Sequence, residues 1–243
     1  MLRKVNYGES DVIATLLTRD HGIVSVIARA ARKSTKRFPG LQPLRPIQTT
    51  IRRKPNATMH TLHEAIVLSE YRGLEASLAK ISTASYLTEL TGSLLREGDP
   101  SESFFDALDG MYSEIANDTS SDEALVLLTS AFELRLLNLS GWAPRFDACF
   151  DCGLVSAEME SFRVVRSGEG LVCDGCRGGR RYGSISGDVL RWLHYLQSPM
   201  HHDAPNESPD FDTINRVVRA SVDANVVKAV SYTHLTLPTT PYV

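Results

Sequence analysis

Two pairs of cysteines carry the clearest chemical signal in the sequence. Cys149 and Cys152 form the first pair and Cys173 and Cys176 the second, with the spacing C-x2-C-x20-C-x2-C. Two residues between ligands let one tight turn aim both sulfurs at the same ion, so this spacing predicts a four-cysteine zinc site. Gly153 follows the first pair directly and suits the left-handed backbone that such turns often adopt.

The zinc predicted from this spacing is structural, with one ion per chain. Four thiolates leave no open coordination position for water, which disfavours a catalytic zinc. A thioredoxin-like redox motif needs only one of the two pairs and a βαβ setting, and is therefore disfavoured as well. Disulfides and metal-free thiols are the remaining alternatives, and intracellular reductants work against structural disulfides.

A long stretch without acidic residues is the second signal. Residues 21–63 contain no Asp or Glu, although the whole chain has 29 acidic and 26 basic residues and a net charge of −3. An evenly solvated surface would not separate its charges in this way, so the asymmetry predicts an anionic partner for the N-terminal part. The stretch carries nine positive charges: Arg29, Arg32, Lys33, Lys36, Arg37, Arg45, Arg52, Arg53 and Lys54.

The first third of the chain, which must position this charge, has the pattern of a β domain. Runs rich in β-branched residues predict short strands at 11–18, 22–30, 46–54 and 57–68. Their close spacing favours a small barrel or sandwich over βαβ units. The basic residues then lie partly on strands and partly on the loop 32–40 between two of them.

From about residue 73 the apolar residues recur at helical spacing. We expect one helix up to about Gly98, a second from about Ser101, a third over 120–141 and a fourth over 187–197, which makes the fold class α+β with more than one domain. The expected apolar residues of the first helical segment are Leu74, Leu78, Ile81, Leu87, Leu90 and Leu94. The expected core of the helical domain includes Leu90, Phe132, Leu136 and Trp192.

Length and composition narrow the class of protein. The chain has 243 residues, 42% of them hydrophobic, which is enough for one large or two smaller packed domains. It has no apolar run long enough to span a bilayer, no secretory signal and no phosphate-loop, dinucleotide, zinc-protease or serine-hydrolase motif. We therefore expect a soluble intracellular protein that is not an enzyme.

The pieces suggest a domain division. We expect a β domain over 1–72, a helical domain over 73–228 with a zinc knuckle at 149–176, and an anomalous tail over 229–243. The tail has no Asp, Glu, Lys or Arg, is rich in Thr and Pro, and breaks the preceding helical pattern.

The order of these domains, together with several sequence segments within them, resembles the RecO family of bacterial recombination mediators. The similar segments are "YGESDVIATLLTRDHGIVSVIARAARKSTKRFPGLQPL" at 7–44, "ASYLTELTGSLL" at 84–95, "AFELRLLNLSGWAP" at 131–144 and "GLVCDGCR" at 170–177, together with the two cysteine pairs. The first of these segments is the most specific, since cysteine pairs occur in many zinc proteins.

The resemblance implies an N-terminal OB barrel followed by a helical domain with an inserted zinc knuckle. It also implies a cytoplasmic, nucleoid-associated protein that binds single- and double-stranded DNA, anneals complementary strands and has no small-molecule substrate. Its implied partners are RecR and the single-strand-binding protein, on whose coated strands it would help to load RecA. Against the family pattern, we expect a first strand shortened at Met1 and a C-terminal helix cut near Val230.

The resemblance agrees with the charge pattern, because OB barrels bind single strands through a positive groove and aromatic platforms. Phe38, inside the basic loop, is the expected stacking residue, with an anchor packed on the barrel as the other interpretation. Three further functions stay open: an RNA-binding factor of translation or transcription, a hydrolase or nuclease with unrecognised carboxylates, and a scaffold for partner proteins.

Overall fold

The computed structural model describes residues 1–34, 36–53, 57–96, 99, 102–118, 121–198 and 204–235. The chain forms two compact units, Met1–Leu125 and Val126–Val243. Each unit has its own sheet and its own buried cluster, and each is described by itself.

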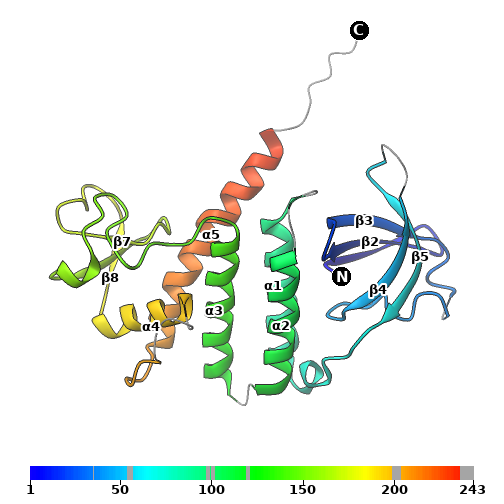
Figure 1. Ribbon diagram of the computed structural model, residues 1–243, viewed down its shortest axis with the longest axis horizontal. Helices are drawn as coiled ribbons and strands as arrows, with labels where there is room; N and C mark the ends of the chain where they lie inside the picture. Colours follow the sequence, from blue (N-terminus) through cyan, green and yellow to red (C-terminus); the bar gives the residue numbers. More distant parts are fainter. Residues whose placement is uncertain are drawn as a thin grey trace, which may run out of the picture. The chain divides into compact units, whose positions relative to one another are not determined.

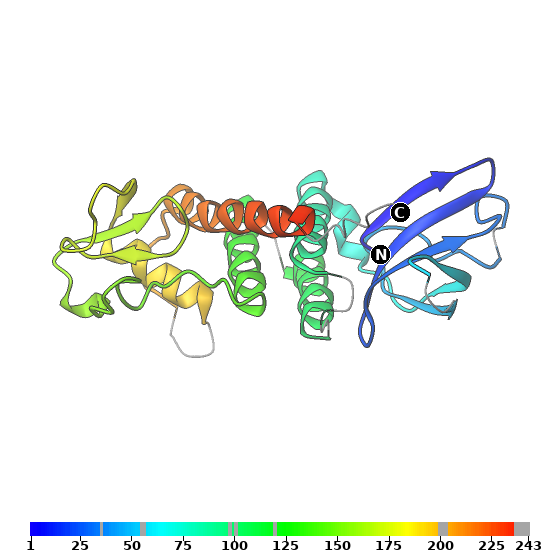
Figure 2. The same ribbon diagram turned by 90° about the horizontal axis from the view of Figure 1, so that it is seen from above.

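A five-stranded sheet forms the N-terminal part of the first unit (Figures 1 and 2). Its order is β1-β2-β3-β5-β4, with β3 and β5 parallel and the other neighbours antiparallel. A five-stranded, partly open sheet of this kind agrees with the expected OB fold. The strands are β1 (Arg3–Tyr7), β2 (Asp11–Thr18), β3 (Gly22–Ala28), β4 (Ile47–Arg52) and β5 (His60–Val67).

Buried and accessible side chains alternate along β2 and β3, and the buried ones form the core of the barrel. Every second residue is buried, and these residues pack together inside the barrel. The residues between them form the outer face of the sheet and remain partly accessible, apart from the buried Leu17. The inner row consists of Val12, Ala14, Leu16, Val24, Val26 and Ala28.

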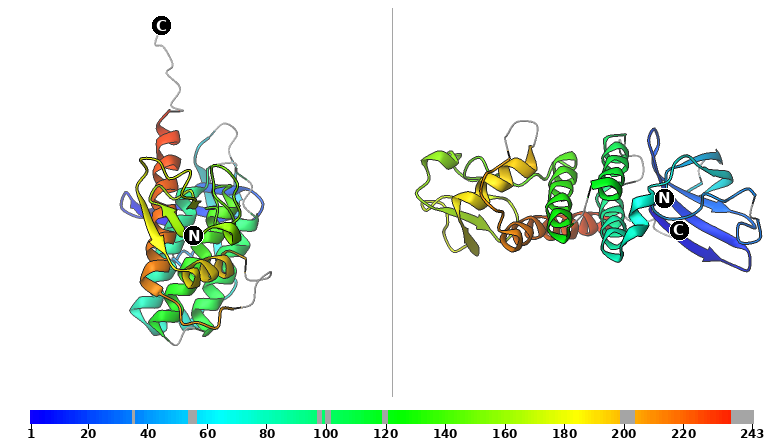
Figure 3. Two further views of the ribbon diagram at one scale, coloured as in Figure 1. Left: turned by 90° about the vertical axis from the view of Figure 1, so that its left-hand side faces the viewer. Right: turned by 90° about the horizontal axis from the view of Figure 1, so that it is seen from below.

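Two helices complete the first unit after the short 3-10 helix η1 (Arg72–Ala76): α1 (Leu78–Leu94) and α2 (Glu102–Asp118). They lie side by side (Figures 1 and 3). Leu78 and Ile81 are 79% and 36% exposed, so the expectation that they belong to the buried face is wrong. Thr88 and Thr91 are buried instead, and each hydroxyl is satisfied because it donates to a carbonyl of its own helix, while that of Thr88 also contacts the Tyr112 hydroxyl.

The second unit contains most of α3 (Asp122–Leu139), a three-stranded sheet and two further helices. The sheet order is β7-β6-β8, with β6 (Phe162–Val165), β7 (Leu171–Val172) and β8 (Tyr182–Ile185). A single 3-10 turn, η2 (Ser156–Glu158), precedes this sheet, and α4 (Gly187–Gln197) and α5 (Phe211–Leu235) follow it.

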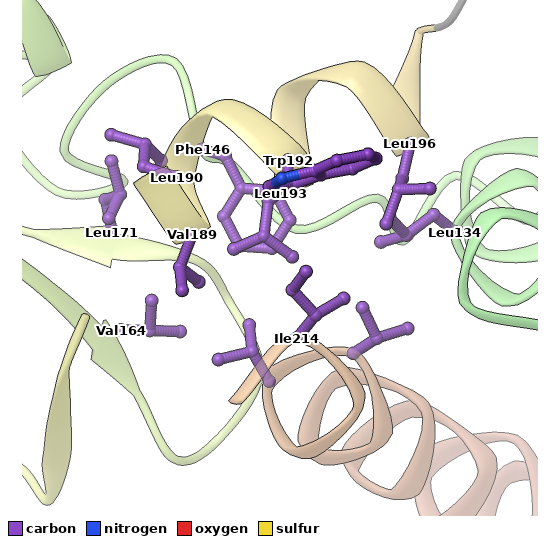
Figure 4. Packing of buried hydrophobic residues seen from close by; sticks show 12 residues of the cluster. Leu134, Phe146, Val164, Leu171, Val189, Leu190, Trp192, Leu193, Leu196 and Ile214 are labelled. Carbon is purple, nitrogen blue, oxygen red and sulfur yellow. The ribbon is translucent and has the colours of Figure 1, made fainter. Parts of the chain in front are cut away.

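The core of the second unit lies between α4, α5 and the small sheet (Figure 4). Leu193 and Ile214 are fully buried there, and the indole Nε1 of Trp192 donates to the Glu207 carbonyl at 3.0 Å. The Ser186 hydroxyl fixes the start of α4, where it accepts a hydrogen bond from the Val189 N–H at 3.2 Å. The predicted burial of Leu90, Phe132, Leu136 and Trp192 is confirmed, because each is at most 8% exposed, but Leu90 lies in the first unit and the other three lie in the second.

The C-terminal helix departs from the prediction. Helix α5 continues to Leu235, past residue 229, where the composition predicts a break in the helical pattern. The rest of the predicted tail, 236–243, lies outside the described residues. Among the described residues, no helix has the length and apolarity that crossing a membrane requires.

Candidate metal centre and nucleic-acid interface

The four cysteine sulfurs lie together in the second unit. All four Sγ atoms are within 4.8 Å of one another, and those of Cys152 and Cys173 are 3.7 Å apart. A zinc ion with Zn–S bonds of about 2.3 Å gives a tetrahedron whose edges measure about 3.8 Å. The sulfurs are therefore spaced as ligands of one tetrahedral ion, and the donor set is the one that structural zinc prefers.

Local turns bring each pair of sulfurs to the same point. After the first pair, the Gly153 N–H donates to the Cys149 carbonyl at 2.9 Å, and Gly153 has a φ of +78°, as the sequence predicts. After the second pair, the Cys176 N–H donates to the Cys173 carbonyl at 3.1 Å. Cys149 and Cys173 are buried, while Cys152 is exposed.

The electrostatics of the cluster favour a bound cation. Burial raises the pKa of Cys149, but N–H groups of Cys152, Cys173 and Asp151 outweigh it and lower that pKa to about 6. The hydrogen bonds of Cys176 with Cys152 and Cys173 raise the pKa of Cys176 to about 12. The thiols therefore do not ionise equally on their own, and four thiolates can coexist only where a cation balances them.

Ion pairs support the two cysteine turns from outside. Asp151, between the first two cysteines, pairs with Arg180, whose guanidinium lies 4.9 Å from the centre of the Phe150 ring. Asp174, between the second two, pairs with Arg163 at 2.7 Å and with Arg177 at 3.4 Å. These contacts fix the orientation of the loops that carry the sulfurs.

The predicted nucleic-acid residues are mostly exposed on the barrel of the first unit. In the described part of the chain, none of the exposed ones is within ion-pair distance of a carboxylate. Their positive charge therefore faces solvent without an internal counter-charge. The exposed residues are Arg29, Arg32, Lys33, Lys36, Arg37, Arg52 and Arg53.

The loop that carries most of this charge, residues 29–40, is called the basic loop below. Its start is fixed where the Ala30 N–H donates to the Asp11 carboxylate at 2.8 Å. Its end is fixed on β5, where the Ala65 N–H donates to the Arg37 carbonyl at 2.9 Å and the Gly40 N–H to the Ala65 carbonyl at 3.2 Å. The basic side chains thus project from a loop whose backbone is held at both ends.

Phe38 anchors the basic loop, and the expected stacking role is corrected. Its side chain is 6% exposed and packs in the barrel core beside Leu41. The guanidinium of Arg37 lies 5.1 Å from the centre of the ring. A base therefore cannot stack on Phe38, because protein atoms already cover the ring.

Two further predicted contacts, Arg45 and Lys54, do not belong to this exposed set. The Arg45 guanidinium pairs with Glu70 at 3.2 Å and with Glu75 at 3.4 Å, so its charge is neutralised within the protein. Its role as a nucleic-acid contact stays a prediction, and these ion pairs weaken it. Lys54 lies outside the described residues.

The barrel surface has an exposed aromatic residue that the sequence analysis did not single out. Tyr7, at the end of β1, is 56% exposed, and Val5 on the same face is 43% exposed. The alternation "RKVNY" before Gly8 could have indicated an outward-facing tyrosine, but only once its strand partner was known. A small cavity of about 160 Å³ lies at the start of β3. His21, Arg53 and His60 are among the residues that line it.

The second unit also has a larger cavity, of about 790 Å³, between the small sheet and α5. Val164, Ile185 and Val217 contribute its apolar lining, and Arg166 and Arg216 lie among its polar residues. Among the described residues, no cluster of His, Cys, Asp or Glu that could hold a metal lies in this cavity.

Comparison with known proteins agrees with this arrangement. The family model described as "Recombination protein O N terminal" matches residues 1–71, and the one described as "Recombination protein O C terminal" matches residues 75–229. Together they extend over nearly the whole chain.

Individual relatives match over much of their length, and each is named DNA repair protein RecO. The one from Anaeromyxobacter sp. (strain Fw109-5) is 36% identical over 177 residues, 72% of this chain and 68% of the relative. The one from Myxococcus xanthus (strain DK1622) is 34% identical over 210 residues, 85% of this chain and 83% of the relative. The one from Rubrobacter xylanophilus is 29% identical over 235 residues, 95% of this chain and 92% of the relative. With its barrel, its helices, its cysteine cluster and these matches, the chain belongs to the RecO family.

Proposed function

We propose that this chain is a cytoplasmic, non-enzymatic DNA-binding and strand-annealing protein of recombinational repair. It acts with RecR to help load RecA on single strands coated by single-strand-binding protein. Membership of the RecO family supports the repair role. The observation that carries the DNA-binding part is the exposed charge of the basic loop, which has no carboxylate within ion-pair distance among the described residues.

Physical chemistry favours a nucleic-acid backbone as the partner of this charge. Phosphates are spaced regularly along a strand, and lysine and arginine neutralise them while releasing condensed counterions. Such contacts position a strand without reading its sequence. A protein that holds two strands in this way and leaves their bases free to pair can promote annealing between any complementary sequences.

The cysteine cluster has a structural role in this proposal. One zinc ion held by Cys149, Cys152, Cys173 and Cys176 would fix the knuckle against the helices of the second unit. The cluster lies in the second unit and the basic loop in the first, so we expect metal loss to affect stability more than DNA affinity.

Reversal of charge in the basic loop tests the proposed function. Arg32, Lys33, Lys36 and Arg37 are exposed, and replacing all four with Glu places eight units of charge change on one loop. We expect most binding to an oligothymidylate to be lost, the salt dependence of the remainder to flatten and annealing of complementary strands to disappear.

A matched variant distinguishes the loop from net charge. It carries four reversals to Glu at exposed arginines of the second unit: Arg135, Arg166, Arg181 and Arg216. We expect this variant to keep more affinity than the loop variant by at least about tenfold, since phosphate contacts act within about one Debye length. If a folded loop variant, checked by circular dichroism, binds as the wild type does, the proposed function is wrong.

A further inference from the structure

The outer face of β1, β2 and β3 presents an apolar row to solvent. The strand register places Val5 opposite Ile13, and Ile13 opposite Ile27, so the three side chains lie in line across the sheet. Val5 is 43% exposed, and Ile13 and Ile27 are partly exposed. Within the described residues of the barrel, this row is the side of the sheet turned away from the core cluster.

Tyr7 lies at the end of this face that borders the basic loop. The turn that follows Tyr7 holds Arg32, whose N–H donates to the Ser10 carbonyl at 3.0 Å and whose guanidinium donates to the Glu9 carbonyl at 3.2 Å. Asp11, the register partner of Tyr7, directs its carboxylate to the Ala30 N–H at the start of the same loop. The turn thus joins the strand that carries the exposed Tyr7 ring to the exposed Arg32 guanidinium, and it also carries the exposed Glu9.

We propose that Tyr7 is the base-stacking residue of a single-strand binding track. Bases pass over Tyr7 and the row of Val5, Ile13 and Ile27, while the phosphates follow the basic loop that begins beside them. This inference rests on the proposed function and names the residue on which its strand stacks. Aromatic platforms beside a positive groove are the means by which proteins bind single strands without sequence preference.

The charge of the neighbourhood selects this occupant over an apolar peptide strand. A peptide that paired with β1 would place its own side chains beside Arg32 and the rest of the basic loop, where an unpaired basic surface favours a polyanion. Stacking on a tyrosine face accepts any base, so the apolar row and the basic loop together fit a single strand of mixed sequence.

The test compares Tyr7→Thr and Tyr7→Phe for binding to a fluorescein-labelled oligothymidylate and to an abasic strand of equal length. Threonine keeps the strand propensity of the site and removes the ring. We expect Tyr7→Thr to weaken oligothymidylate binding by about 5- to 150-fold, and Tyr7→Phe to bind within about twofold of the wild type. The abasic strand should show no difference between tyrosine and threonine, because it has nothing to stack.

Two controls separate stacking from other effects. Ile66→Thr removes an exposed apolar side chain from β5 of the same barrel and should leave affinity unchanged. The slope of log affinity against log salt should be equal for Tyr7→Thr and the wild type, because stacking releases no counterions. Suppose that the wild type binds with strong salt dependence. If Tyr7→Thr then loses affinity equally for thymidylate and abasic strands, or loses none, the inference is overturned while the proposed function stays in place. A wild type that binds no strand would instead defeat the proposed function itself.

Discussion

Replacement of Cys152 by serine should remove the metal and unfold the knuckle. Cys152 is exposed, so serine removes no buried packing, and any loss of stability reports the missing ligand. Among the described residues, the knuckle's own buried cluster consists of Val165, Val172, Cys149 and Cys173, and Phe150, Leu154 and Met159 pack against it partly buried. Two such valines contribute about 3–6 kcal/mol, whereas structural zinc contributes about 10–16 kcal/mol in small zinc peptides.

The loss should reach the helices of the second unit. Val164 and Leu171 belong to the knuckle segment and Phe146 lies just before it, and all three are buried in the cluster with α4 and α5. If each contributes about 1.5–3 kcal/mol, their release should lower the melting temperature by at least about 10 °C. Thermal unfolding by circular dichroism measures this fall, and hydrogen exchange should show fast exchange within 149–176.

A matched variant and a metal analysis complete the experiment. Asp151→Asn removes the ion pair with Arg180 but keeps all four sulfurs, so it should retain one zinc per chain. Wild-type protein treated with a chelator should behave like Cys152→Ser. If Cys152→Ser keeps one zinc per chain and the wild-type melting temperature, or if wild-type protein purified under reducing conditions without chelator contains no zinc, the metal assignment fails.

Three other perturbations test the packing and the pH response of the second unit. Leu136→Ala should lower the free energy of unfolding by about 2–5 kcal/mol in urea titrations, because Leu136 is 0% exposed, and a loss below about 0.5 kcal/mol would contradict its place in the core. The Arg219 guanidinium lies 3.2 Å from the buried Glu133 carboxylate, and Arg219→Met, which removes it, should lower the free energy of unfolding by about 2–3 kcal/mol. Adding Glu133→Gln in a double variant should restore part of this loss. The Thr213 N–H lowers the pKa of Asp210 at the start of α5, so its contribution is present at neutral pH and is lost as the pH falls below about 4. Asp210→Ala should cost about 1 kcal/mol at pH 7 and less at pH 2, and an equal cost at both pH values would contradict this assignment.

The sequence predicts the elements of this fold better than their faces. The strand 11–18 and the helix 187–197 have the predicted bounds, because β-branched alternation and a serine cap with helical periodicity are local signals. Leu78 shows what local signals miss: it continues the apolar period of α1 but lies in the first turn, outside the buried stripe. Which residues of a helical stripe find a partner depends on the neighbouring elements, and composition does not contain that information.

The same distinction applies to the functional residues. Cysteine spacing alone predicted a cluster that the structure confirms, because the ligands themselves enforce the geometry. The role of Phe38 depended on whether the ring faces solvent or the core, and a loop sequence is compatible with either. Arg45 finds Glu70 and Glu75 just beyond the acid-free stretch, so a count of charges along the chain could not show that it is neutralised.

The most direct test of the central claim is the salt dependence of single-strand binding by the unmodified protein. An oligothymidylate is titrated at several salt concentrations between about 50 and 200 mM, and the slope of log affinity against log salt is determined. If the basic loop and its neighbours contact about six phosphates, the slope should be near −4. Binding whose affinity does not change with salt, or no binding at the lowest salt, would contradict the claim that this charge meets a nucleic-acid backbone.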